Sequence, residues 1–64
     1  MIQLYTVEYK IMGQFYKKTV SIERNEDRHY VFRNRETNKL FMLDKKRIID
    51  IRRAGRLDSV EVFV

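Results

Sequence analysis

Apolar and polar side chains alternate on both sides of Gly13, and this alternation constrains the fold more than any other feature of the sequence. A period of two residues is typical of a β-strand with one buried face. If Met12 and Gly13 form a two-residue turn, the two alternating segments become a hairpin with a fixed register. The predicted cross-strand pairs are Ile11–Gln14, Tyr9–Tyr16, Glu8–Lys17, Val7–Lys18, Thr6–Thr19 and Tyr5–Val20. The Glu–Lys and Thr–Thr pairs are each expected to contribute roughly 0.2–1 kcal/mol.

This register also separates the side chains into two faces, and a shift by one residue would mix them. The apolar face consists of Tyr5, Val7, Tyr9, Ile11, Tyr16, Val20 and Ile22, with Lys18 as its charged member. The mostly polar face consists of Leu4, Thr6, Glu8, Lys10, Phe15, Lys17, Thr19 and Ser21. We therefore expect the apolar face to pack in the core and Phe15 to be exposed near the turn.

Further turns are predicted along the chain. The segments "YVFRN" and "KLFML" flank "RETN", where either a three-residue loop with a left-handed Asn38 or a four-residue loop fits. Phe32 faces Phe41 in one case and Met42 in the other. The charged segment 23–28 predicts a loop. A last turn is predicted at Ala54-Gly55, which brings Arg53 opposite Arg56, Ile51 opposite Asp58 and Ile49 opposite Val60.

The segment "DKKRIIDIRRAG" (residues 44–55) is compatible with two structures. A short helix would begin at Asp44 as its N-cap, end in a basic last turn and stop before Gly55. A strand is favoured instead, because Ile48, Ile49 and Ile51 are β-branched and lose side-chain freedom in a helix.

Short strands at regular spacing, separated by turn signals, predict an all-β fold with a single small domain over residues 1–64. We expect a five- or six-stranded antiparallel meander that forms a small barrel or a curved sheet. The segment "YVFRNRETNKLFMLDKKRIIDIR" resembles the end of SH3-like and Sm-like barrels, in which a curved hairpin is followed by a polar kink and a last strand with isoleucines. It also resembles the barrel of WYL domains, although the tripeptide that names that family is absent.

Composition excludes several classes of function. The 64 residues include no cysteine and only one histidine, His29, which excludes disulfides, thiolate zinc sites and histidine-rich metal sites. Ser21 and Ser59 are the only serines, so a nucleophile–base pair lacks its usual partners and we expect no enzyme, metal or cofactor. There is no apolar run long enough to cross a bilayer and no signal-peptide pattern, so we expect a soluble, cytoplasmic protein.

The charge balance favours an acidic partner, because 14 basic residues outnumber 9 acidic ones. The leading hypothesis is a binding module that holds RNA or DNA through a basic strip. The predicted phosphate contacts are Arg33, Arg35, Lys45, Lys46, Arg47, Arg52, Arg53 and Arg56, and the predicted stacking residues are Tyr30 and Phe15.

The alternative is a protein–protein interaction module or inhibitor, such as a small bacterial or phage accessory protein that occupies the surface of a host protein. In that case the exposed apolar residues make the contact and the charges provide solubility and steering. The C-terminal segment "SVEVFV" (residues 59–64) is predicted to be an edge strand. Such an edge can pair with a partner strand or join copies into a homo-oligomer.

Overall fold

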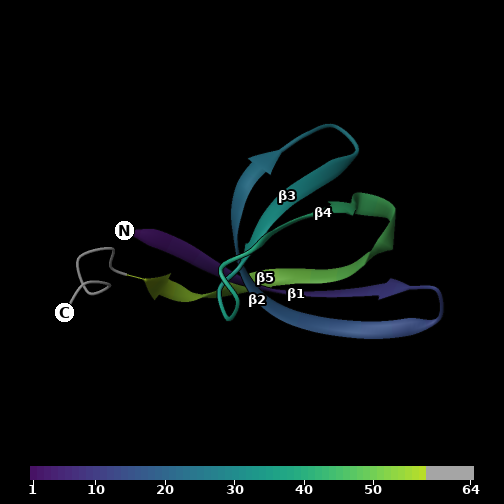
Figure 1. The fold of residues 1–64 in the computed structure, drawn as a ribbon, viewed down its shortest axis with the longest axis horizontal. Helices are drawn as coiled ribbons and strands as arrows, with labels where there is room; N and C mark the ends of the chain where they lie inside the picture. Colours follow the sequence, from purple (N-terminus) through teal and green to yellow (C-terminus); the bar gives the residue numbers. More distant parts are fainter. Residues whose placement is uncertain (58–64) are drawn as a thin grey trace.

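The structure, a computed structural model, describes residues 1–57 and contains one antiparallel sheet of five strands (Figure 1). The strands are β1 (Ile2–Ile11), β2 (Gln14–Asn25), β3 (His29–Asn34), β4 (Leu40–Asp44) and β5 (Ile48–Leu57). They lie in the order β4-β3-β2-β1-β5, so β1 to β4 form a meander and β5 returns to pair with β1. The predicted all-β class is confirmed. Within residues 1–57 no pairing of β4 with β5 closes the sheet, so the curved sheet describes it rather than the barrel.

The β1–β2 hairpin has the predicted register from Tyr5–Val20 to Ile11–Gln14. Met12 and Gly13 form its turn with φ angles of 51° and 81°. Positive φ at both central residues is the conformation whose twist matches the flanking strands of a two-residue hairpin. Local turn chemistry and the separation of the two faces therefore specify the same register.

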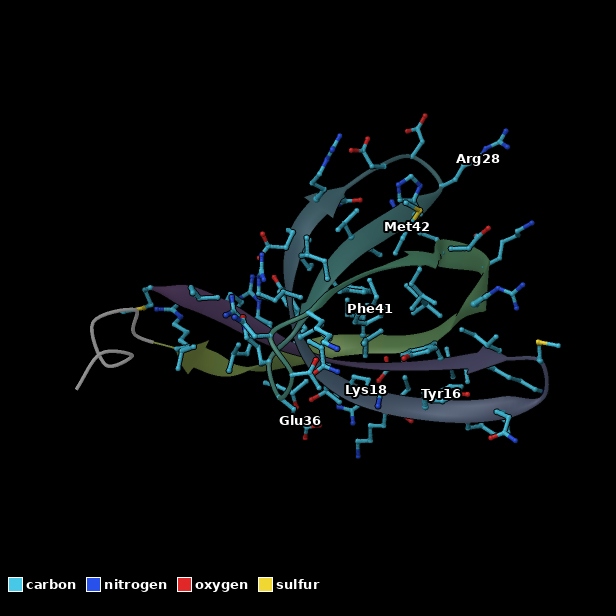
Figure 2. All side chains as sticks on the ribbon, in the orientation of Figure 1. Tyr16, Lys18, Arg28, Glu36, Phe41 and Met42 are labelled. Atoms are coloured by element: carbon cyan, nitrogen blue, oxygen red, sulfur yellow. The ribbon has the colours of Figure 1, made fainter. Side chains whose placement is uncertain are left out.

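Strand β2 belongs to both halves of the sheet, which makes the sheet strongly curved. It pairs with β1 through residues 14–20 and with β3 through residues 20–25, so the two pairings share only Val20. Figure 1 shows β2 turning away from β1 toward β3 beyond this point. The core lies inside the curve, and its buried side chains are Val7, Tyr9, Val20, Phe32 and Leu43. Phe41 lies between the two halves (Figure 2) and packs on Tyr9 and Phe32.

The β3–β4 hairpin places Phe32 opposite Phe41. Its loop has four residues, 35–38, and is closed by a 2.8 Å hydrogen bond that the Asn34 amide donates to the Lys39 carbonyl. Asn38 adopts a left-handed conformation with φ 63°. The sequence was compatible with a three-residue loop containing a left-handed Asn38 or with a four-residue loop. The structure has the four-residue loop, and Asn38 is left-handed within it.

The predicted turn at Ala54-Gly55 is wrong. Strand β5 continues through both residues without reversing direction. Gly55 lies opposite Leu4 at a β-bulge, and its φ angle is 120°. A bulge needs an unusual backbone conformation as much as a turn does, so glycine is suited to either. The bulge places Arg53 opposite Tyr5, so Arg53 does not face Arg56.

The other pairs predicted for the last hairpin change in the same way. Ile51 lies opposite Val7 instead of Asp58, and Ile49 is the extra residue of a second bulge in β5. The predicted 23–28 loop is shorter than expected, because β2 continues to Asn25 and only residues 26–28 connect it to β3. The sixth strand and the edge strand predicted at residues 59–64 lie outside the described residues.

Residues 44–55 form a short 3-10 turn followed by a strand, so each of the two predicted structures is present in part. Asp44 caps a single 3-10 turn, η1 (Lys45–Arg47), by accepting a 2.9 Å hydrogen bond from the Lys46 amide. The chain is extended from Ile48 to Leu57, which confirms the strand. Because η1 is the only helical segment in residues 1–57, that part of the chain contains no helix able to cross a bilayer.

Candidate nucleic-acid interface

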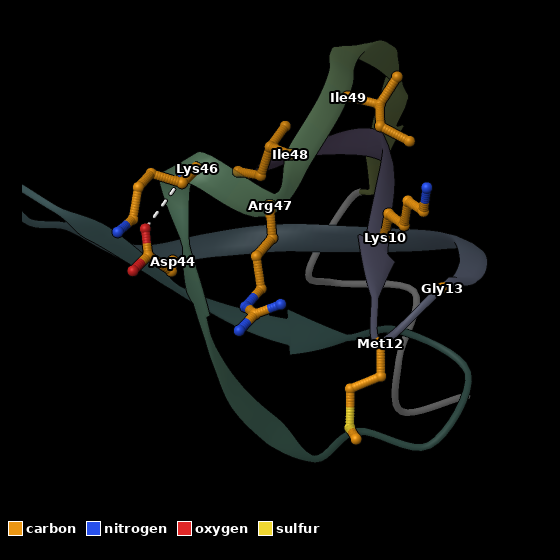
Figure 3. A pocket seen from close by; sticks show the side chains of 8 residues that line it. All are labelled: Lys10, Met12, Gly13, Asp44, Lys46, Arg47, Ile48 and Ile49. Carbon is orange, nitrogen blue, oxygen red and sulfur yellow. Dashed lines mark hydrogen bonds between the residues drawn. The ribbon is translucent and has the colours of Figure 1, made fainter.

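An open groove of about 550 Å³ lies between η1 and the tip of the β1–β2 hairpin. It forms because the pairing of β5 with β1 begins at Ile48 and Tyr9, so the last residues of β1 extend beyond β5. Figure 3 shows η1 on one side of the groove and the end of β1 on the other. The groove is lined by Lys10, Met12, Gly13, Asp44, Lys46, Arg47, Ile48 and Ile49.

The groove is predominantly cationic. Lys10 comes from β1, whereas Lys46 and Arg47 come from η1, more than thirty residues later in the sequence. The one carboxylate of the lining, Asp44, is hydrogen-bonded to the Lys46 amide. Within residues 1–57, none of the three cations forms an ion pair with a carboxylate. Their charges are therefore available to an anionic ligand.

A second hollow of about 360 Å³ lies on the other side of η1 and extends the positive region. Its lining consists of Asp27, Arg28, Asp44, Lys45 and Lys46. Since Asp44 and Lys46 line both hollows, the two adjoin. The loop that carries Arg28 lies next to η1, because the Arg28 carbonyl accepts a 2.9 Å hydrogen bond from the Lys45 amide, and the Arg28 side chain points outward (Figure 2).

Tyr30, a predicted stacking residue, is half-buried and already in contact with two side chains. Its ring stacks on Phe32 with centroids 5.1 Å apart, and the Lys45 ammonium lies 4.8 Å from its centroid. The ring therefore holds the side chain of Lys45, the first residue of η1. A base would have to displace one of these contacts to stack on it.

Phe15, the other predicted stacking residue, is 70% exposed, as expected from the hairpin register. It lies opposite Lys10 in the β1–β2 pair, and the Lys10 ammonium is 5.1 Å from the centre of its ring. Lys10 thus belongs to both features, since it contacts Phe15 and lines the groove.

Arg33 and Arg35 make intramolecular contacts. The Arg33 guanidinium is 3.2 Å from the Glu23 carboxylate and donates a 3.0 Å hydrogen bond to the Asn38 carbonyl. Arg35 donates a 3.0 Å hydrogen bond to the hydroxyl of the buried Ser21. Both arginines hold the β3–β4 loop against β2, away from the groove.

Arg52 is compensated by two carboxylates on the outer face of the sheet. Its guanidinium binds the Glu8 carboxylate at 2.7 Å and also the Asp50 carboxylate. The hydrogen bonds to Glu8 and Asp50 raise the pKa of Arg52 above its usual range. The Arg52 guanidinium thus offsets the repulsion between Glu8 and Asp50, two negative charges that lie directly opposite each other in the β1–β5 register.

Arg53 and Arg56 lie toward the other end of β5, opposite Tyr5 and Gln3. The predicted cations therefore do not form one continuous strip. Lys45, Lys46 and Arg47 make up η1, while the remaining arginines are distributed over other parts of the sheet.

Lys10 and Arg28, which line the two hollows, were not predicted from the sequence. The hairpin register placed Lys10 beside Phe15, but it contained no information on which later segment would approach the end of β1. Arg28 lies in a short charged loop, and its position next to η1 depends on the pairing of β3 with β4.

Comparisons with family models, curated proteins and solved structures find no match to this chain. Within the described residues 1–57, no three His, Asp or Glu side chains are grouped as metal ligands. The chemistry of the groove must therefore be inferred from its own residues.

Proposed function

We propose that this protein is a non-catalytic module that binds nucleic acid through the groove between η1 and the β1–β2 tip. The observation that supports the proposal most is that Lys10, Lys46 and Arg47 all line one open groove, and none of them forms an ion pair with a carboxylate in residues 1–57. The adjoining hollow adds Arg28 and Lys45.

A phosphodiester backbone is the ligand whose chemistry fits this arrangement. Cations spaced along an open groove neutralise successive phosphates and release condensed counterions, which gives affinity that falls with added salt. Arg47 adds a planar fork that can bind two phosphate oxygens at once, whereas the lysines act as point charges. The net charge of +5 attracts a polyanion over a longer range.

The proposal is tested by the affinity of a short, labelled, mixed-sequence oligonucleotide, measured by fluorescence anisotropy over a series of salt concentrations. Lys46→Gln/Arg47→Gln should weaken binding and reduce the steepness of log K against log[salt] by about 1.4, or ~0.7 for each lost contact with a single strand. Arg53→Gln/Arg56→Gln is the matched control.

Both double variants lower the net charge from +5 to +3, so only position distinguishes them. Equal losses in the two variants would show that binding depends on overall charge and would contradict a groove. An absence of binding by the wild-type protein at low salt would contradict the proposed function itself.

The structure also offers a second candidate function, protein binding at the edge of β4. In residues 1–57, β4 pairs only with β3, and its register contains no bulge. Leu40 and Met42 are 55% and 66% exposed on this strand. The opposite edge strand, β5, carries two bulges and several charges, which are common protections against pairing. An unprotected apolar edge can receive a strand from a partner protein.

A pull-down with nuclease-treated lysate tests this candidate, with Leu40→Thr/Met42→Thr as the variant, because threonine keeps strand propensity and removes apolar surface. A protein retained by the wild type and lost with the variant would support binding at the β4 edge. Equal retention by both would rule that edge out as the contact.

A further inference from the structure

We infer that the groove and Phe15 together form a site for single-stranded nucleic acid, in which one unpaired base stacks on the Phe15 ring. The inference rests on the proposed function and narrows it from polyanions in general to strands whose bases are accessible. It depends on two observations: the Lys10 ammonium contacts the Phe15 ring, and Lys10 also lines the groove.

Phe15 is the most exposed aromatic side chain in residues 1–57, with 70% of its surface open. Tyr9 and Phe32 are buried, and Tyr16 is 39% exposed and stacks on Tyr9. Since the other rings already pack against protein, Phe15 is the one able to receive a base without rearrangement. Stacking on an exposed aromatic ring is tolerant of base identity because every base has a flat π-face.

The order of strands arranges the stacking residue and the cations across the tip of the hairpin. Phe15 lies on β2, Lys10 lies beside it on β1, and the groove with Arg47 lies on the far side of β1. A strand that crosses the tip in this direction meets the ring first and then a succession of positive charges. The Lys10 ammonium, 5.1 Å from the ring centre, places a charge next to a stacked base.

The arrangement favours a single strand over a duplex. In a duplex both faces of an internal base are covered by its neighbours, so the ring of Phe15 has nothing to stack on unless a base is displaced, which costs energy. Cations alone do not make this distinction, since they contact phosphates of either form. The ring is therefore expected to determine the preference for the single strand.

The test compares wild type, Phe15→Leu and Phe15→Tyr for binding to a single-stranded oligonucleotide and to the duplex of the same sequence. Phe15→Leu should weaken single-strand binding roughly 5- to 150-fold, the range expected for loss of one stacked base, and leave duplex binding unchanged. Phe15→Tyr should restore most of the single-strand affinity. The dependence on salt should be the same in all three proteins, because no phosphate contact is removed.

A spectroscopic readout identifies the stacking itself. The chain contains no tryptophan, so Phe15→Trp introduces a single indole. Its fluorescence should be quenched when the single strand is added and should be unaffected by the duplex.

The outcomes separate this inference from the proposed function. If Lys46→Gln/Arg47→Gln loses affinity while Phe15→Leu does not, the inference is wrong and the proposed function stands. Equal losses for single strand and duplex in Phe15→Leu would also overturn the inference. If the wild type binds neither nucleic acid, both fail together.

Discussion

The rings of Tyr9 and Tyr16 stack across the β1–β2 pair, with centroids 5.2 Å apart and an angle of 16° between their planes. Tyr9 is buried and Tyr16 is partly exposed, so the stack connects the core to the surface near the hairpin tip. Burial raises the pKa of Tyr9 above its ordinary value, and the proximity of Tyr16 raises it further. Ionisation of Tyr9 is therefore unfavourable in the folded protein.

This shift predicts a loss of stability at alkaline pH. The unfolded chain releases the Tyr9 proton near pH ~10, and the folded chain holds it to higher pH. The stabilisation is fully present below pH ~10 and is lost as the pH rises through the higher, folded pKa. Thermal unfolding of wild type and Tyr9→Phe between pH 8 and pH 11 should show the steeper fall in Tm for the wild type. Parallel curves would contradict this assignment.

Removal of the Arg52 charge should destabilise the fold, because Glu8 and Asp50 lie opposite each other and Arg52 binds both. We expect Arg52→Gln to lower Tm, and the additional change Asp50→Asn to recover part of the loss. Arg53→Gln is the control, since it removes a neighbouring arginine without this contact. Restoration of Tm by high salt in Arg52→Gln would confirm that repulsion is the cause.

Gly55→Ala should destabilise the protein by about 1–2 kcal/mol, because its φ of 120° is strained for any residue with a Cβ. No atom outside Gly55 and its two chain neighbours lies within 4 Å of the position that the Cβ would occupy, so the loss comes from the local backbone conformation and not from contacts with other parts of the fold. Chemical denaturation with urea measures the difference. If the free energy of unfolding is unchanged, residues 54 and 55 do not form the bulge.

Asp44 connects the local structure to the proposed function, since it caps η1 and lines the groove. Asp44→Asn keeps a capping oxygen and removes a negative charge, so it should retain stability and bind oligonucleotides more tightly at low salt. Asp44→Ala should instead lose about 1 kcal/mol of stability with the cap. If Asp44→Asn binds the oligonucleotide more tightly and keeps the wild-type Tm, the result supports both the capping role and the place of Asp44 in the groove.

The register and turn of the first hairpin could be predicted because their determinants are local, although Ser21, which was placed on the polar face, is buried and Tyr16, which was placed on the apolar face, is 39% exposed. The Met12-Gly13 turn fixes the register, and the alternation of side chains confirms it independently. The same local reasoning was wrong at Gly55, where a turn and a bulge require similar backbone conformations. Whether Gly55 forms a turn or a bulge depends on the strand with which residues 48–57 pair. That strand is β1, which is far away in the sequence.

The candidate site was predictable only in part for the same physical reason. The cluster at Lys45–Arg47 is contiguous in sequence, and Phe15 follows from the hairpin register. The approach of η1 to Lys10 depends on the return of β5 to β1, which no local pattern indicates. Arg52 pairs with Asp50, which is close in sequence, and also with Glu8, which only the pairing of β5 with β1 brings to it.

The most direct test of the proposed binding site is a titration of ¹⁵N-labelled protein with a short single-stranded oligonucleotide, followed by amide chemical shifts. The groove predicts the largest changes at residues 10–15 and 44–49, with little change at residues 53–57. Shifts concentrated on β4 or around Arg53 and Arg56, or no shifts at low salt, would contradict it.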